Sequence, residues 1–252
     1  MLFNKSSKSL SAVFRSFDVP STLTCISSPE CPSVSGDLPE FQAPTVDIPQ
    51  AMKSSNDPGA IQTVAYVQMA NSFNSYLSFF NPPAGALSKS TASQDDDWSY
   101  NWNVNDESGQ YTVTLTVNRT DEGTEWKVAI SGTMEGRTVN NWVFIQGEQT
   151  ADGKNGKIYV FNPELAPAAV LVFEVTNAID ANNIHLLTFL SPEDFKLVLT
   201  SNPDSSGDLI ASEWLNGEFI KEFTSNWNSS GAGSWISYNK DGTPDEQGSW
   251  GG

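Results

Sequence analysis

The chain has 252 residues, and its 30 acidic side chains against 13 basic ones give a formal net charge of −17. Such a protein repels phosphate backbones and anionic lipid surfaces, so nucleic acid is excluded as an expected partner, whereas cationic partners and divalent metals remain open. One histidine, His185, and two cysteines exclude most familiar catalytic sets and a tetrahedral zinc site. We therefore expect no catalytic centre, no cofactor and no metal site.

The N-terminal segment is rich in proline, since residues 20–58 hold seven of the fourteen prolines, which predicts an extended tether or a strap laid on the surface. Cys25 and Cys31 lie in this segment within the sequence CISSPEC, and a local disulfide is the simplest use for them. A disulfide and an Asn/Ser/Thr-rich composition favour an extracytoplasmic location, in the periplasm, on the outer membrane surface or secreted. No secretory leader is readable in residues 1–20, and no apolar run is long enough for a transmembrane helix.

One helix is predicted after this segment, with Asp57 as its N-cap, Pro58 at its first position and Asn81-Pro82-Pro83 as its end. Apolar residues recur between these ends at helical spacing: Ile61, Ala65, Met69, Phe73, Leu77 and Phe80. The stretch from Pro58 to Ser88 carries no charge, so we expect the polar face to be partly covered too, with the helix cradled by a sheet. A membrane-surface helix is the alternative, but such helices favour Lys and Arg.

The rest of the chain alternates apolar and polar residues between short Gly/Asn/Asp turns, which predicts antiparallel strands. We expect strands at residues 98–104, 110–118, 125–132, 140–147, 156–161, 168–176, 184–190, 194–200, 208–214, 217–226, 232–238 and 246–250. The predicted fold is mainly β (α+β): a large antiparallel meander curled into a barrel or half-barrel around one N-terminal helix. Residues 1–56 would form an arm, and residues 57–252 a single domain.

Four tryptophans stand in the last forty residues: Trp214, Trp227, Trp235 and Trp250. Indoles beside amides and hydroxyls suit the binding of sugar rings or amphipathic ligands, although tryptophan in a meander is more often a core residue. We treat the four as candidate ligand-binding residues.

The segment from Gly233 to Trp250 forms a predicted hairpin with Gly-Ser-Trp on both arms. Together with Asn-Asn-Trp-Val at 140–143, it resembles the G-x-W hairpin units of uncharacterised bacterial cell-envelope and lipoprotein-like β-meander proteins. The resemblance implies a curved antiparallel sheet in the cell envelope and no known reaction.

Carboxylates are the remaining candidates for catalytic or metal-binding side chains. A pair of acids can hydrolyse glycosides without histidine, and Glu174 and Glu213 are the best candidates, with structural hydrogen-bond anchors as the alternative. The Asp-rich turns at 204–208 and 239–246 offer oxygens for Ca²⁺, but neither completes an EF-hand loop, and hairpin turns use the same residues. His185 stands in a predicted strand, where a packed or surface imidazole is the ordinary explanation.

The sequence thus predicts a non-catalytic extracytoplasmic or cell-envelope protein that binds a small apolar or amphipathic ligand between helix and sheet. A carbohydrate-binding module using the C-terminal tryptophans is the alternative, and a histidine-free glycoside hydrolase is the second alternative. The sequence does not fix the oligomeric state.

Overall fold

The computed structural model describes residues 38–41, 43, 45–83, 86–88, 97–107, 109–134, 136–162, 169–176 and 185–251. The predicted disulfide between Cys25 and Cys31 lies outside the described residues. In the described part of the chain, no helix has both the length and the apolar character needed to cross a membrane.

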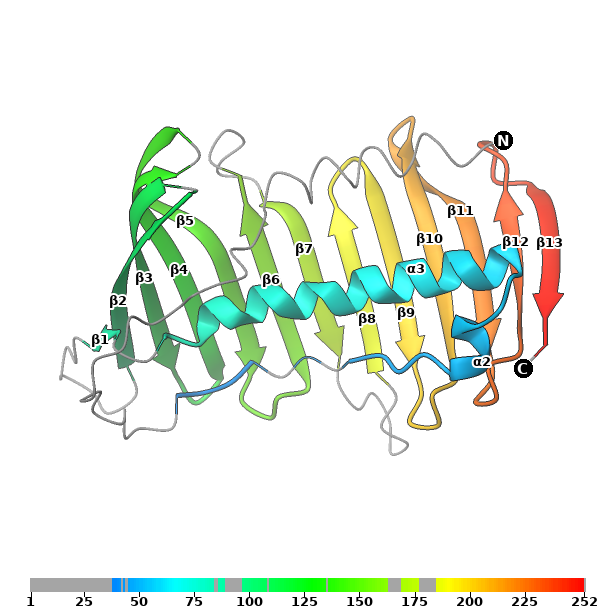
Figure 1. Ribbon diagram of the computed structural model, residues 1–252, viewed down its shortest axis with the longest axis horizontal. Helices are drawn as coiled ribbons and strands as arrows, with labels where there is room; N and C mark the ends of the chain where they lie inside the picture. Colours follow the sequence, from blue (N-terminus) through cyan, green and yellow to red (C-terminus); the bar gives the residue numbers. More distant parts are fainter. Residues whose placement is uncertain are drawn as a thin grey trace.

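In the described part of the chain, thirteen antiparallel strands form one sheet in which spatial order follows sequence order (Figure 1). The strands are β1 (Leu87–Ser88), β2 (Asp97–Asp106), β3 (Gly109–Arg119), β4 (Gly123–Met134), β5 (Arg137–Thr150), β6 (Asn155–Phe161), β7 (Ala169–Thr176), β8 (His185–Ser191), β9 (Phe195–Ser201), β10 (Gly207–Leu215), β11 (Glu218–Trp227), β12 (Gly233–Tyr238) and β13 (Pro244–Trp250). The twelve predicted strands correspond to β2 through β13, so the antiparallel meander is confirmed. Within the described residues β1 and β13 stand at opposite edges, and the sheet is not closed into a barrel.

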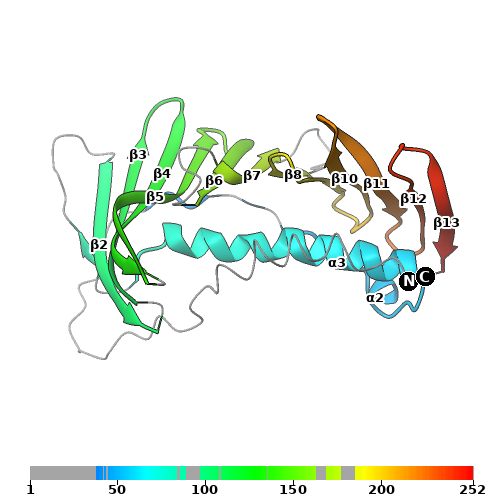
Figure 2. The same ribbon diagram turned by 90° about the horizontal axis from the view of Figure 1, so that it is seen from above.

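The helical part comprises α2 (Gln50–Lys53), α3 (Pro58–Ser72) and the 3₁₀ helix η1 (Phe73–Phe80). α3 and η1 run along the concave face across the strands, from β12 and β13 to β4 (Figures 1 and 2). The Asp57 carboxylate accepts hydrogen bonds from the backbone N–H groups of Gly59 (2.8 Å) and Ala60 (3.2 Å), which confirms the predicted N-cap. The α-helix ends earlier than expected because the last predicted turns tighten into η1.

The buried face of α3 differs from the predicted apolar stripe. Ile61 is 55% exposed and Ala65 is exposed, whereas the buried residues are Gly59, Ala60, Thr63, Tyr66, Val67 and Ala70. Steric fit explains the difference, because a Cβ atom on Gly59 would overlap the Trp235 ring of the sheet. The first turn of α3 therefore faces the sheet with its small residues Gly59 and Ala60, and Tyr66 and Val67 follow on the same buried face.

The polar side of α3 is covered only in part. The Asn71 side chain exchanges hydrogen bonds of 2.9 Å with the backbone N–H and C=O of Val46, as expected for a covered amide. Gln68 and Ser72, by contrast, are exposed. The segment before α2 therefore covers the polar face of α3 at Asn71, as expected, whereas the polar residues Gln68 and Ser72 of the same helix remain exposed.

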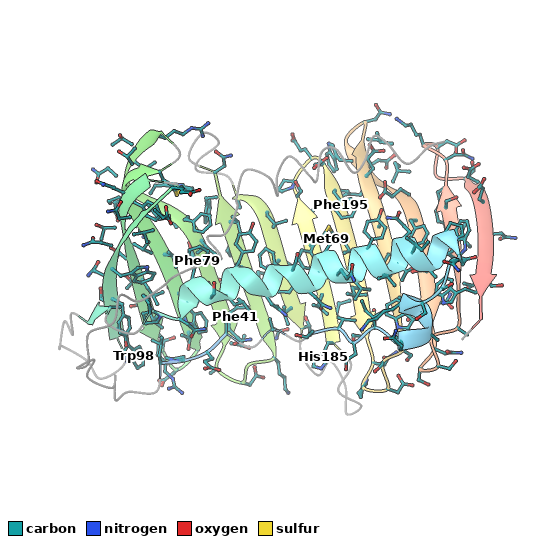
Figure 3. The ribbon with its side chains drawn as sticks, in the orientation of Figure 1. Phe41, Met69, Phe79, Trp98, His185 and Phe195 are labelled. Atoms are coloured by element: carbon teal, nitrogen blue, oxygen red, sulfur yellow. The ribbon has the colours of Figure 1, made fainter. Side chains whose placement is uncertain are left out.

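The core lies between the helix and the concave face of the sheet. Phe73 packs on Phe173 and Phe189, with ring centroids 4.7 and 5.4 Å apart. Phe41, from the segment before α2, packs edge-on against Trp126 at 5.6 Å. In Figure 3 Phe41 lies on the opposite side of the helix from Phe79. The described part of the predicted arm thus shares the core of the sheet, and the domain boundary at residue 57 stays a prediction.

The sheet bends most strongly at β2–β5, which wrap round the end of the helix (Figure 2). The register between β4 and β5 shifts twice, between Val128 and Ala129 and between Ile130 and Gly132. Asn141 has a φ of 49° and its N–H donates to the Ser131 hydroxyl at 2.7 Å. Such bulges increase local twist, which accounts for the curl at this end.

Candidate functional site

A groove with a volume of about 370 Å³ crosses β4, β5, β6 and β7 near the edge of the sheet that carries the β3–β4 and β5–β6 turns. We call it the β4–β7 groove. Its lining residues are Thr120, Glu122, Gly123, Thr124, Glu125, Glu148, Gln149, Thr150, Asn155, Gly156, Lys157, Glu174, Val175 and Thr176.

Strand register arranges this lining in three rows. The first row, which we call the acidic row, contains Glu125, Glu148, Lys157 and Glu174, each directly opposite the next on the neighbouring strand. The second row is Thr124, Gln149, Gly156 and Val175, and the third is Gly123, Thr150, Asn155 and Thr176.

The rows show which face of the sheet carries the groove. Gln149 and Val175, in the second row, are only 7% and 1% exposed and point toward the core. Because side chains alternate across a sheet, the first and third rows point to the convex face. The groove therefore runs on the convex face between these two rows, with the backbone of the second row as its floor.

Negative charge dominates the β4–β7 groove, where four carboxylates face one ammonium group. Lys157 Nζ lies 2.9 Å from Glu174 Oε1, and the Tyr159 hydroxyl donates to Glu148 Oε1 at 3.1 Å. The hydrogen bond and the charge of Glu174, with a smaller contribution from Glu148, raise the pKa of Lys157. No cationic side chain in the described ranges pairs with Glu122 or Glu125.

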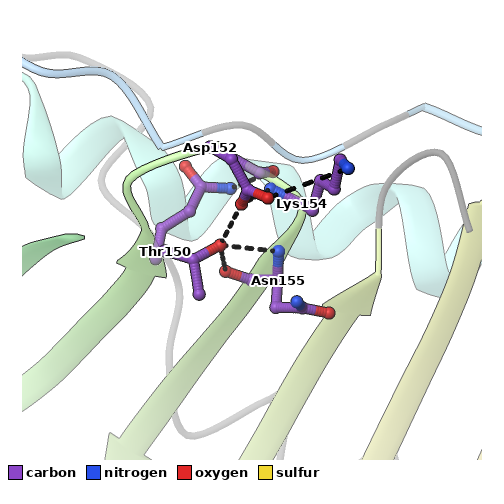
Figure 4. Close-up of polar contacts among 6 residues, drawn as sticks. Thr150, Asp152, Lys154 and Asn155 are labelled. Carbon is purple, nitrogen blue, oxygen red and sulfur yellow. Dashed lines mark hydrogen bonds and ion pairs between the residues drawn. The ribbon is translucent and has the colours of Figure 1, made fainter. Parts of the chain in front are cut away.

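The β5–β6 turn, which brings Thr150 and Asn155 to the groove, is held by its own hydrogen bonds (Figure 4). The Thr150 hydroxyl donates to Asp152 Oδ1 at 2.7 Å, and the Asn155 N–H donates to the Thr150 hydroxyl at 3.1 Å. The hydrogen bond from Thr150, followed by that from the Lys154 backbone N–H, lowers the pKa of Asp152. These bonds fix the turn and keep the third row in place.

Clustered carboxylates can also hold a metal ion. Across the described residues, no group of three or more His, Cys, Asp or Glu side chains is placed to hold a metal. In the two Asp-rich turns, Asp204 and Asp241 accept hydrogen bonds from the Ser206 and Thr243 hydroxyls, both at 2.6 Å, which lower the pKa of each carboxyl. These two carboxylates thus accept hydrogen bonds from residues of the turns in which they stand.

The structure does not bring the two predicted catalytic acids together. Glu174 lies in the acidic row on the convex face. Glu213 pairs with the buried Phe195 and raises the pKa of Glu222, which contacts the helix, so it belongs to the concave side. Opposite faces of one sheet cannot form one cleft.

The four candidate tryptophans differ in burial. Trp227 and Trp250 are 3% and 6% exposed, and their indole N–H groups donate to the backbone carbonyls of Ser205 and Gly231. Trp235 is half-buried, stacked on Phe223 with ring centroids 6.2 Å apart. Trp214 is half-buried and packs edge-on against Phe219 at 4.8 Å. Trp227 and Trp250 offer no open ring face, and the ligand-binding role of the four stays a prediction.

His185 begins β8, is half-buried, and lies on the same side of the helix as Phe41 (Figure 3). Sequence reasoning missed Glu125, Glu148 and Lys157 as site residues. Their outward positions near neighbouring strand ends were a usable signal, but combining them required the register across four strands.

Comparison with protein-family models and with curated proteins finds no match for this chain. The functional proposal therefore rests on the geometry of the groove.

Proposed function

We propose that the protein is a non-catalytic binding protein that holds a cationic ligand in the β4–β7 groove. One observation carries the proposal: four carboxylates and a single ammonium group line a groove of about 370 Å³. The opposite face of the sheet is occupied by the helix, so the convex face is the side on which a ligand meets these charges.

Charge pairs at an exposed site contribute about 0.2–1 kcal/mol each. Three or four such contacts give at most about 3–4 kcal/mol, which corresponds to a Kd in the millimolar range or weaker. Binding should weaken with salt because exposed charges are screened. The groove thus supports a weak, salt-sensitive cation site.

Isothermal titration calorimetry with spermidine and with trilysine tests the proposal. The double variant E125Q/E148Q should lose binding, because it removes two carboxylates and keeps the side-chain shapes. The matched control E218Q removes an exposed carboxylate on β11, away from the groove, and should bind as the wild type does. Equal binding by E125Q/E148Q and by the wild type refutes the proposal, as does equal binding of an N-acetylated, uncharged analogue.

A second candidate keeps the apolar or amphipathic ligand expected from the sequence. Where α3 and η1 lie on the sheet, Ala60, Val67 and Phe73 are fully buried. The observation in favour of such a ligand lies on β5, where the buried indole N–H of Trp142 has no hydrogen-bond partner among the described residues. Half-buried apolar residues surround this end of the core: Phe79, Trp98, Trp102, Tyr111 and Val139. Native mass spectrometry before and after organic extraction tests for a bound lipid, and an unchanged mass contradicts the candidate.

An extracytoplasmic location is also part of the proposal, supported by CISSPEC and by the composition. Mass spectrometry of the alkylated protein, with and without prior reduction, tests the disulfide between Cys25 and Cys31. Free thiols in protein purified from its native host contradict it. The carbohydrate-binding alternative is tested by fluorescence titration with glycans, which should quench Trp214 if it holds.

A further inference from the structure

The β10–β11 hairpin carries an Asn-Gly dipeptide, Asn216-Gly217, at its exposed tip (Figure 1). We propose that Asn216 is a site of covalent modification, at which the side-chain amide is converted without an enzyme into aspartate and isoaspartate. Two observations lead to this site: the open geometry of the turn, and the contrast with the other Asn-Gly and Asp-Gly steps of the chain. Cation binding in the β4–β7 groove plays no part in it.

The reaction needs water as its only co-reactant. The deprotonated backbone nitrogen of Gly217 attacks Cγ of Asn216, a C–N bond forms, and the side-chain nitrogen leaves as ammonia. The product is a five-membered succinimide ring. Water then opens the ring, giving aspartate when it attacks the side-chain carbonyl and isoaspartate when it attacks the main-chain carbonyl. One water thus replaces one ammonia, and nothing is oxidised or reduced. Glycine suits the attacking position because it has no Cβ to hinder the approach.

The turn leaves both reacting groups open. Asn216 and Gly217 have φ values of 52° and 95°, as in the two-residue type I′ turns that join antiparallel strands. Both residues are exposed, and a Cβ atom on Gly217 would meet no heavy atom within 4 Å. Neither the Gly217 N–H nor the Asn216 side chain is hydrogen-bonded to any described residue. The turn therefore breaks no hydrogen bond of these two groups when it rotates the nitrogen onto Cγ.

The two Asp-Gly turns hold the corresponding groups in place. In Asp152-Gly153 and in Asp241-Gly242, the glycine N–H donates to a backbone carbonyl at 2.8 Å. Each aspartate also accepts a hydrogen bond from a threonine hydroxyl, at 2.7 and 2.6 Å. An ionised carboxylate must in addition take up a proton before one of its oxygens can leave. These turns are therefore poor sites for the same ring closure.

Asn155-Gly156 is the matched Asn-Gly step within the same chain. Gly156 is buried inside β6, where its backbone is paired with Gln149 on β5 and with Val175 on β7. The Phe41 ring lies against it, since a Cβ atom on Gly156 would come within 2.6 Å of Phe41. Attack on Asn155 therefore requires β6 to open first, whereas attack on Asn216 requires only a movement of an exposed turn.

Incubation of the full chain at neutral and at mildly alkaline pH, followed by proteolysis and tandem mass spectrometry, tests this inference. In the folded protein, the peptide with Asn216 should change from amide to carboxylate at least about tenfold faster than the peptide with Asn155, because only Asn155 needs local opening. The rate at Asn216 should rise with pH, since the attacking nitrogen must lose its proton. In urea, which removes the protection of Asn155, the two rates should converge.

N216D is the control variant, because aspartate tolerates the positive φ of this turn. It should show no further mass change in this peptide and should keep the far-ultraviolet circular dichroism of the wild type. Equal rates at Asn216 and Asn155 in the folded protein overturn the proposal. A product without isoaspartate overturns the succinimide route, and a rate difference that persists in urea overturns its structural basis. Calorimetry with freshly purified protein measures cation binding separately, so either proposal can fail alone.

Discussion

Replacing Tyr66 with phenylalanine should destabilise the protein by about 2 kcal/mol, because it leaves the half-buried carboxylate of Glu222 without its donor. The Tyr66 hydroxyl donates to Glu222 Oε1 at 2.6 Å. Glu222 reaches the helix because of a β-bulge: Ala211 faces Phe223, and the next residue of β10 faces Lys221, so no β10 residue stands opposite Glu222. The bulge re-aims one carboxylate from β11 into the concave side.

The electrostatics of this contact give a pH signature. Burial raises the pKa of Glu222, and the negative charges of Glu213 and Asp194 raise it further. The hydrogen bond from Tyr66 lowers this pKa but does not cancel the effect of burial. A carboxyl whose pKa is raised on folding favours the folded state least when it is ionised. Its contribution to stability therefore falls as the pH rises from the ordinary value of 4.5 through the pKa in the folded state. The variant E222Q lacks this dependence.

Thermal unfolding between about pH 4.5 and pH 8 measures both effects. In a domain of this size a loss of about 2 kcal/mol lowers Tm by roughly 4–8 °C. Y238F is the matched control, because among the described residues the Tyr238 hydroxyl meets only the Thr224 hydroxyl, at 3.3 Å; this substitution should cost less than about 1 kcal/mol. The stability of E222Q relative to wild type should rise with pH. A Tm for Y66F equal to that of Y238F, or a constant difference for E222Q, refutes the reasoning.

Three further substitutions test the fold and the site. G59V should destabilise the protein by about 2 kcal/mol or more, measured by denaturant unfolding, because its side chain would overlap Trp235; a neutral result would mean that the helix can shift away from the sheet. D57A should cost about 1 kcal/mol in the same assay through loss of the N-cap, and D57N should restore most of it. E125Q should raise the free energy of unfolding by about 0.5 kcal/mol, because it relieves the cross-strand repulsion with Glu148. This gain should shrink in high salt, which screens the repulsion.

The sheet was predictable because a period of two survives in the sequence wherever one face is buried and the other is wet. Val113, Leu115 and Val117 alternate with threonines, and in the structure these three are at most 1% exposed. Because the turns between the predicted strands are short, consecutive strands must be antiparallel neighbours, since parallel strands need a long crossover connection. Closure into a barrel was not predictable, because strand count alone does not decide whether the first and last strands meet.

The helix was predictable in its position and not in its rotation. Asp57 and Pro58 mark its start by local chemistry, which needs no tertiary information. Its buried face depends on Trp235, which lies far away in the sequence and demands a glycine opposite its ring. Hydrophobicity pointed to Ile61, whereas close packing selected Gly59 and Ala60.

The candidate site was out of reach for a related reason. Glu148 and Glu174 become neighbours of Lys157 only when the registers of β5, β6 and β7 are known. A slip of one residue would turn every side chain of a strand to the other face, so the groove exists only in the correct register. Sequence reasoning identified Glu174 but matched it with Glu213, which lies on the opposite face.

The acidic row is more than a by-product of a negative protein. Solubility requires only a net charge, which staggered carboxylates supply without repulsion between directly opposed residues. Here Glu125 faces Glu148 across one strand pair, an arrangement that destabilises a sheet. Lys157 offsets part of that repulsion from the next strand, whereas no cationic side chain among the described residues forms an ion pair with Glu125. A cationic ligand bound across β4 and β5 would complete the neutralisation that Lys157 begins, which is why we place the function on the convex face.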